Sequence, residues 1–166
     1  HDYVLASDTD SLYVTLDSLV QKVGLTDKDK IIEFMDKVCE GKIQDVIDKC
    51  YGEMAEYVNA FEQKMVMKRE VLAEVGIWTS KKHYILNVHN SEGVQYDEPK
   101  LKIMGIEAVR SSTPESCRNA LKEAFKIMMN GTEDDVINYI EAFKTKFKAL
   151  PTEEVSFPRS VKGLAK

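Results

Sequence analysis

An apolar stripe with helical spacing, over residues 31–61, constrains the fold of this chain more than any other feature. Thr26 and Asp29 precede it with the S/T-x-x-D/E spacing that is typical of a helix start. Gly41 and Gly52 each cost roughly 1 kcal/mol in a helix, yet the stripe keeps its phase through both. We therefore expect one long helix, or two in line, packed on another layer. The stripe comprises Ile31, Phe34, Met35, Val38, Ile43, Val46, Ile47, Cys50, Met54, Tyr57, Val58 and Phe61.

A polar tetrad, Asp8-Thr9-Asp10-Ser11, lies between two runs of β-forming residues within residues 3–16. Asp and Ser are favoured in turns, and the flanking residues are favoured in strands. The pattern therefore predicts a β-hairpin with a tight polar tip. Asp8 and Asp10 would both lie at that tip.

The segment from residue 64 to about residue 110 is strand-like. Turn signals such as Asn90-Ser91-Glu92-Gly93 separate its β-rich runs, and we expect a small antiparallel sheet. The predicted strands include residues 65–67, 75–78, 84–88 and 101–104.

Two helices are predicted after the sheet. Thr113 is expected as the N-cap of the first helix, with Pro114 at the first helical position and Gly131 as the stop. A capping pattern at residues 132–135 begins the second helix, which reaches about Leu150. The whole order predicts an α+β fold, in which an antiparallel sheet with a long packed helix is followed by a helical segment.

The composition is that of a soluble globular protein, with 43% hydrophobic and 31% charged residues in a chain of 166. No apolar run approaches the roughly 20 residues that cross a bilayer, so we expect an intracellular protein with no membrane partner. The chain starts at His1 without an initiator Met, which suggests a piece of something longer. The net charge of −5 argues weakly against nucleic-acid binding, but acids concentrate in residues 27–63 and bases in residues 144–166. A basic surface is therefore compatible with the net charge.

The cysteines Cys39, Cys50 and Cys117 lack the C-x-x-C spacing of a zinc or redox site. On one helix, Cys39 and Cys50 would lie about 16 Å apart, which a disulfide cannot span. We expect all of them to be reduced.

The Asp8-Thr9-Asp10 tripeptide leaves several interpretations open by itself. Two carboxylates this close repel each other unless a cation lies between them or one is protonated, and Mg²⁺ is commonly held by one or two carboxylates plus substrate phosphates. A solvated turn is an alternative, because Asp is a favoured turn residue. The D-x-D motif of sugar-nucleotide transferases is another. An EF-hand is excluded, because the glycine and glutamate that its loop requires are absent.

The string Asp8-Thr9-Asp10-Ser11-Leu12-Tyr13-Val14 resembles motif C of the family B DNA polymerases. Segments 67–71, 78–88, 98–107 and 111–114 follow in the right order and resemble the T-even-type phage branch of that family. The resemblance runs from about Val4 to Lys166. It implies that residues 1–105 are the C-terminal part of the polymerase palm and that residues 106–166 begin the thumb.

The resemblance also implies roles for the acidic residues. Asp10 matches the aspartate that ligates both catalytic Mg²⁺ ions, and Asp8 matches its supporting partner. Glu70 matches a further acid near the metals, although a solvated strand charge is the alternative there. The family commonly has Tyr-Gly before the D-T-D string, where this chain has Ala6-Ser7.

A basic element is similar to the K-K-R-Y string that lies along the primer–template duplex. Its residues here are Lys81, Lys82 and Tyr84, while His83 replaces the arginine and is expected to make one duplex contact pH-dependent or absent. Such residues suit a sequence-independent grip on DNA. An exposed basic strand edge that prevents aggregation is the alternative. The further DNA-binding candidates are Arg110, Lys102, Lys100 and Arg159.

The resemblance implies a fragment of a replicative DNA-directed DNA polymerase that performs two-metal nucleotidyl transfer from dNTPs onto a primer. The other catalytic aspartate of such enzymes lies in a D-x-x-S-L-Y-P-S string, which this sequence lacks. We therefore expect the chain to be inactive alone. The implied partners are primer–template DNA, dNTP, the remaining polymerase domains or chain, and a sliding clamp, in the cytoplasm of an infected bacterial host.

Two alternatives to this function remain at this point. The first is a non-catalytic, duplex-binding subunit of a split polymerase that assembles with a separate N-terminal chain. The second is a D-x-D glycosyltransferase. It is disfavoured because no nucleotide-sugar-binding βα unit precedes the acids.

Overall fold

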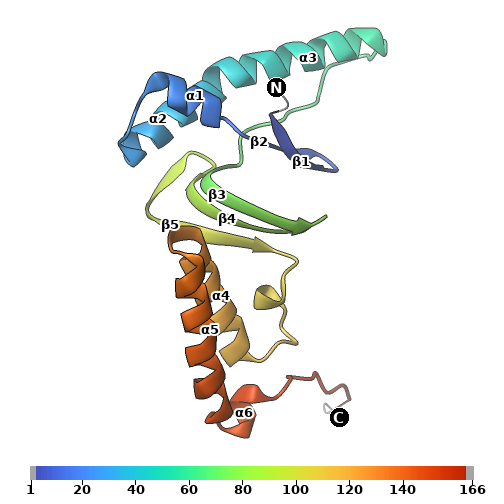
Figure 1. Ribbon diagram of the computed structural model, residues 1–166. Coiled ribbons are helices and arrows are strands. Elements are labelled where there is room, and N and C mark those ends of the chain that lie inside the picture. Colours follow the sequence, from blue (N-terminus) through green and yellow to red (C-terminus); the bar gives the residue numbers. More distant parts are fainter. Residues whose placement is uncertain (1–2, 164–166) are drawn as a thin grey trace. The chain divides into compact units, whose positions relative to one another are not determined.

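The computed structural model describes residues 3–163 and has the predicted α+β fold (Figure 1). The chain forms two compact units. The first comprises His1–Ala73 and Val88–Pro99, and the second comprises Glu74–Asn87 and Lys100–Lys166. Of the predicted palm and thumb segments, residues 1–2 and 164–166 lie outside the described residues.

The first unit begins with the predicted β-hairpin. Strands β1 (Val4–Asp8) and β2 (Ser11–Val14) are antiparallel, and Asp8 is paired with Ser11. Thr9 and Asp10 form the turn between them. The hairpin prediction is therefore confirmed, with a shorter tip than the polar tetrad suggested.

The long helix is continuous, as predicted. Its segments are α2 (Lys28–Val38), the π-helical turn η1 (Cys39–Ile43) and α3 (Gln44–Tyr57). Gly41 lies in the π-helical turn, and the helix continues through this turn without a break. The N-cap is Asp27, not Thr26, because the Asp27 carboxylate accepts a hydrogen bond from the Lys30 backbone nitrogen at 3.0 Å.

The helix ends at Tyr57, before the last two apolar residues of the stripe, and Asn59 beyond it has a positive φ of 51°. Of the stripe, Met35 is buried, and the neighbouring Ile32 and Cys39 are buried with it, whereas the last residues of the stripe are exposed. A short helix, α1 (Asp17–Val23), precedes the long helix and carried no start signal, because its N-cap residue makes no side-chain capping bond.

The predicted sheet consists of β3 (Val71–Ser80), β4 (His83–Ser91) and β5 (Val94–Met104), in that order. Each connection is a two-residue turn, so neighbouring strands are antiparallel. The central strand β4 is buried from Tyr84 to Asn90.

The predicted strand at residues 65–67 was wrong. No strand begins before Val71 in this segment. Side chains satisfy the backbone there instead: the Gln63 amide donates to the Met65 carbonyl oxygen at 2.7 Å, and the Gln44 amide donates to the Met67 carbonyl oxygen at 2.9 Å. These bonds replace a strand ladder.

The second unit contains the predicted helical segment. Helices α4 (Glu115–Asn130) and α5 (Glu133–Lys148) lie side by side, with η2 (Glu107–Val109) before them and α6 (Thr152–Val155) after them (Figure 1). The capping box of α5 is confirmed, with Thr132 and Asp135 as its members. Pro114, not Thr113, is the N-cap of α4. Helix α6 is tied to α4 by the Ser116 hydroxyl, which donates to the Glu154 carbonyl oxygen at 2.6 Å.

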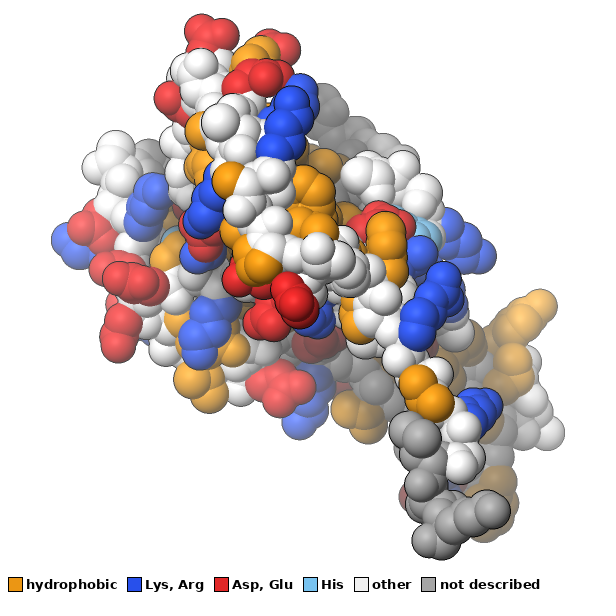
Figure 2. Space-filling view, turned by 90° about the horizontal axis from the view of Figure 1, so that it is seen from below, with side chains coloured by type: hydrophobic (Ala, Val, Ile, Leu, Met, Phe, Trp, Pro, Cys, Tyr) orange, Lys and Arg blue, Asp and Glu red, His pale blue; other side chains and the backbone are white. Residues whose placement is uncertain are grey.

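Charged side chains of both signs are interspersed over the face shown in Figure 2, with hydrophobic side chains visible between them. All three cysteines are free thiols, as predicted. Among residues 3–163, no helix has the length and apolarity needed to cross a membrane.

Candidate functional site

The hairpin tip holds Asp8 and Asp10 in different surroundings. Asp8 ends β1 and is half-buried, and its carboxylate accepts a hydrogen bond from the Thr9 hydroxyl at 3.1 Å. The Ser11 hydroxyl donates to the Asp8 carbonyl oxygen at 3.0 Å. Thr9 has a φ of 55°, which is unusual for a β-branched residue. Asp10 follows in the turn and is exposed. The tip therefore fixes Asp8 locally and leaves Asp10 accessible.

These two carboxylates match part of a Mg²⁺ site. Magnesium is often held by one or two protein carboxylates, with waters and substrate phosphates as the other ligands. Within the described part of the chain, no group of three or more His, Cys, Asp or Glu side chains could hold a metal ion. The exposed Glu70 is thus not gathered with Asp8 and Asp10 into such a group. The donor set fits a magnesium site that further oxygen ligands complete.

Arg69 has a structural role that no sequence pattern predicted. Its side chain is 10% exposed and forms ion pairs with Asp36 of α2 and, at 3.5 Å, with Glu40 of η1. Its Nη1 atom donates to the Asn90 Oδ1 atom of β4 at 2.7 Å. Arg69 therefore fixes the segment before Glu70 against both the long helix and the sheet. The string Lys68-Arg69-Glu70 has no periodicity that would identify which charge is buried.

The lysines of the predicted duplex-binding element form the turn between β3 and β4. Lys81 and Lys82 are exposed, and Lys82 has a positive φ of 63°. His83 bonds back onto the turn, with its Nδ1 atom 2.9 Å from the Lys81 carbonyl oxygen. The Thr79 hydroxyl donates to the His83 carbonyl oxygen at 3.3 Å. The structure therefore places both lysine side chains at an ordered hairpin end.

Tyr84 is only 7% exposed, unlike the neighbouring lysines. Its ring centroid lies 6.3 Å from that of Trp78, at an interplanar angle of 39°. Gly76 makes room for this packing, because a Cβ atom there would lie 2.7 Å from the Trp78 ring. Most of the Tyr84 ring is thus part of the core of the second unit.

Arg110 lies near the same turn. Its guanidinium is about half-exposed, donates to the Gly105 carbonyl oxygen at 3.4 Å and lies 3.3 Å from a Glu107 carboxylate oxygen. Gly105, with a φ of 72°, packs directly on the Lys82 backbone. The Lys82 backbone and the Arg110 guanidinium, which belong to segments far apart in the sequence, therefore both lie next to Gly105. Lys102 is half-buried on β5, and Lys100 and Arg159 are exposed.

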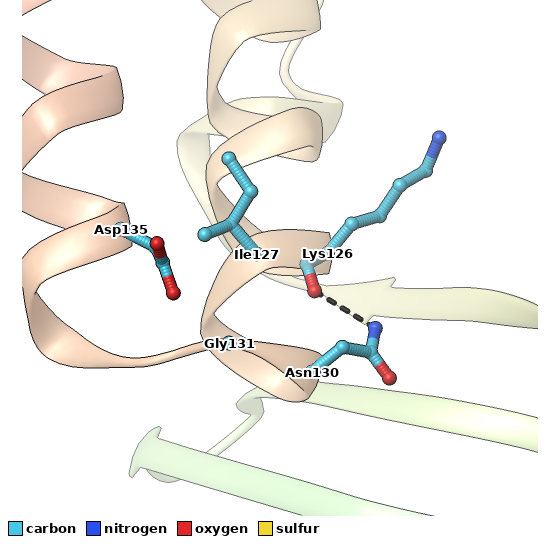
Figure 3. Close-up of a pocket in the computed structure, with 5 residues that line it drawn as sticks. All are labelled: Lys126, Ile127, Asn130, Gly131 and Asp135. Carbon is cyan, nitrogen blue, oxygen red and sulfur yellow. Dashed lines mark hydrogen bonds between the residues drawn. The ribbon is translucent and has the colours of Figure 1, made fainter.

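A separate hollow lies where α4 meets α5 (Figure 3). The Asn130 amide donates to the Lys126 carbonyl oxygen at 2.9 Å, and the Asp135 carboxylate accepts from the Thr132 nitrogen at 2.8 Å. The bonds from Thr132 hold the pKa of Asp135 below its usual range. The polar groups at this hollow therefore cap helices, and none of the predicted site residues lines it. Its lining residues are Lys126, Ile127, Asn130, Gly131 and Asp135.

Comparison with known proteins gives a consistent result. The sequence model of a family described as divergent family B DNA polymerase matches residues 1–145. The DNA-directed DNA polymerase of Escherichia phage RB69 is 38% identical over 175 residues, which cover 99% of this chain and 19% of that protein. The DNA-directed DNA polymerase of Enterobacteria phage T4 is 34% identical over 176 residues, which cover 99% of this chain and 20% of that protein. The chain thus spans about a fifth of the length of these relatives.

Proposed function

Because the chain belongs to the divergent family B DNA polymerases, we propose that it supplies a catalytic carboxylate pair and part of the duplex-binding surface of a replicative DNA-directed DNA polymerase. The main support for this proposal is the arrangement of the carboxylates at the hairpin tip. Asp8 and Asp10 lie one residue apart at a two-residue turn, where one carboxylate is held by a local hydrogen bond and the other is exposed. The resemblance to motif C, stated above, concerns these same residues.

Asp10 would be the principal metal-binding residue, because its carboxylate is accessible. Asp8 would support the site, because the Thr9 hydroxyl already occupies one of its oxygens. When bound, a pair of Mg²⁺ ions would activate the primer 3′-hydroxyl and neutralise charge on the triphosphate of the incoming dNTP. Glu70 is a further acid of this site in the proposal.

The exposed cations of the second unit would bind the primer–template duplex. Lys81, Lys82 and Arg110 are suited to phosphate oxygens, which gives affinity without sequence preference. Tyr84 would contribute mainly by stabilising the strands that carry the turn, since its ring on β4 packs on Trp78 of β3. Lys102 and Arg159 are weaker candidates for backbone contacts.

The proposal includes the division into palm and thumb. Residues 1–105, with the hairpin, the long helix and the sheet, correspond to the C-terminal part of the palm, and residues 106–166 begin the thumb. The helices between Glu107 and Val155 support this division. The remaining polymerase domains, primer–template DNA, dNTP and a sliding clamp are the proposed partners, in the cytoplasm of an infected bacterial host.

A graft tests the catalytic role. The matching fifth of the phage RB69 polymerase is replaced by this chain, and primer extension is measured alongside primer–template binding. Extension by the graft, lost with Asp10→Asn and kept with the exposed Asp17→Asn, would support the proposal. A graft that binds primer–template and does not extend it would contradict a catalytic role for this chain.

A second candidate function is that of a duplex-binding subunit of a split polymerase. It is favoured by one observation: the turn lysines and Arg110 lie together in the second unit, whereas Asp8 and Asp10 lie in the first. In this candidate function, duplex binding would not depend on the carboxylates. Co-purification of the chain with a separately encoded partner that carries the missing aspartate motif would support this candidate.

A further inference from the structure

Gly105 joins two basic segments that lie far apart in the sequence. On one side it packs on the backbone of Lys82, in the turn between β3 and β4. On the other side its carbonyl oxygen accepts a hydrogen bond from the Arg110 guanidinium at 3.4 Å. Gly105 thus contacts both segments, Lys82 at its backbone and Arg110 at its guanidinium.

The space at Gly105 admits no side chain. A Cβ atom there would collide with the Lys82 carbonyl oxygen and would lie 2.9 Å from the Cδ2 atom of the His83 ring. The backbone φ of 72° is also in the left-handed region, which favours glycine. Any larger residue would therefore push the β3–β4 turn away from Gly105.

His83 fixes the turn from the same side. Its ring packs on Gly105, and its Nδ1 atom lies 2.9 Å from the Lys81 carbonyl oxygen. A carbonyl oxygen only accepts hydrogen bonds, so Nδ1 carries the hydrogen. His83 therefore holds the Lys81 backbone while resting on Gly105. The structure gives this residue a local role that does not require it to touch DNA.

We propose that Gly105 is a positioning residue for duplex binding. It holds the Lys81–Lys82 turn and Arg110 in one phosphate-binding surface, and the His83 ring packs on it. This inference rests on the proposed function, in which those cations bind the duplex. It assigns to Gly105 an effect on DNA affinity although the residue itself carries no group that binds phosphate.

The chain offers a matched control for this test. Gly93 also has a positive φ, of 83°, but a Cβ atom there meets nothing within 4 Å. Gly105→Ala and Gly93→Ala therefore share the backbone strain and differ in the collision. Affinity of the full chain for a primer–template hairpin DNA is measured by fluorescence anisotropy from about 50 to 200 mM salt. Melting temperatures of both variants are recorded in parallel.

The expected result is a lower affinity of Gly105→Ala and a shallower dependence of log K on log salt, by about one unit for each phosphate that the variant no longer neutralises. Gly93→Ala should keep the slope of the wild-type chain. A purely structural role would lower the melting temperature of Gly105→Ala and leave the slope unchanged, and that result would overturn the inference. An equal decrease in affinity in both glycine variants would also overturn it.

His83 provides a second test that leaves the glycine in place. His83→Ala removes the ring that rests on Gly105 and should lower the affinity and the salt slope, whether or not Gly105→Ala folds. If Lys82→Ala and Arg110→Ala weaken binding but His83→Ala does not, the positioning inference is wrong and the proposed duplex contacts stand. If the wild-type chain does not bind the duplex at all, both are wrong.

Discussion

The Arg69 guanidinium donates a hydrogen bond to the Asn90 side-chain oxygen across 2.7 Å, which joins the segment before β3 to the central strand. Asn90 is 2% exposed, and Arg69 is also paired with Asp36 of the long helix. A largely buried charge is stable only when it is paired and hydrogen-bonded. This cluster therefore determines how the helix, the sheet and the segment before Glu70 fit together in the first unit.

Replacing Arg69 should destabilise the protein strongly. Arg69→Ala leaves the Asp36 carboxylate and the Asn90 oxygen without their partner, so we expect a decrease of roughly 2–3 kcal/mol in the free energy of unfolding. Urea titration measures this decrease. Lys37→Ala, which breaks an exposed pair with Glu33, is the control and should change stability little. Equal effects of the two substitutions would contradict the structural role of Arg69.

The start of α5 should be sensitive to acid. Hydrogen bonds from Thr132 lower the pKa of Asp135 from its ordinary value of 3.8. A carboxyl group whose pKa is lower in the folded state contributes its full stabilisation when the pH is above the ordinary pKa. This stabilisation is lost as the pH falls through the pKa of the folded state. Asp135→Asn should therefore have a lower melting temperature than the wild-type chain at neutral pH. This difference in melting temperature should become smaller in acid. Thermal unfolding across this pH range, with Asp134→Asn as the control, checks this. A difference that stays constant with pH would contradict it.

The cysteines should differ in reactivity. Burial raises the pKa of the Cys39 thiol, an effect that nearby Arg69 partly offsets, while Cys50 is exposed. Because the thiolate is the reactive form, Cys50 should alkylate first and Cys39 only after unfolding. Time-resolved alkylation with peptide mass spectrometry measures both rates. Similar rates for the two thiols would show that Cys39 is not protected as the structure indicates.

Glu107 should weaken DNA binding by the wild-type chain. Its carboxylate lies 3.3 Å from the Arg110 guanidinium and competes with phosphate for that cation. Glu107→Gln is therefore expected to raise duplex affinity, by up to about fivefold for an exposed pair. Glu98→Gln, an exposed residue of β5 in the first unit, is the control for the change in net charge. Anisotropy titrations that show the same increase for both variants would exclude a specific effect at Arg110.

The purified chain alone should incorporate no dNTP into primed DNA. Its sequence offers the Asp8 and Asp10 pair and lacks the D-x-x-S-L-Y-P-S string that supplies the second catalytic aspartate. A two-metal reaction needs ligands on both sides of the reacting phosphate. A gel-based primer-extension assay checks this, and templated incorporation by the chain alone would refute the proposed inactivity.

The elements with strong local signals could be predicted from the sequence. The hairpin was predicted because a polar, turn-forming tetrad that contains Asp8 and Asp10 lies between two runs of strand-forming residues. The start of α5 was predicted from the capping pattern at residues 132–135, and the Thr132 and Asp135 side chains form the bonds of that cap. The helix also continued through Gly41, as the unbroken phase of its apolar residues indicated.

Other features depended on tertiary contacts that no local pattern reveals. Residues 65–67 have β-forming side chains, but glutamine side chains satisfy their backbone and no strand forms. The duplex-binding string did not show that Tyr84 would pack on Trp78. Nor did it show that Gly105 would meet Lys82, since that contact joins residues far apart in the sequence.

The proposed role of Asp10 is that of a catalytic metal ligand in a family B DNA polymerase. The most direct test is the primer-extension rate of the phage RB69 polymerase graft that carries this chain, compared between Asp10→Asn and Asp17→Asn. Removal of a metal ligand costs several kcal/mol of transition-state stabilisation, so Asp10→Asn should slow extension by about a thousandfold. Asp17→Asn, an exposed change in α1, should stay within about twofold of the unsubstituted graft. Equal extension rates for the two variants would contradict this role of Asp10.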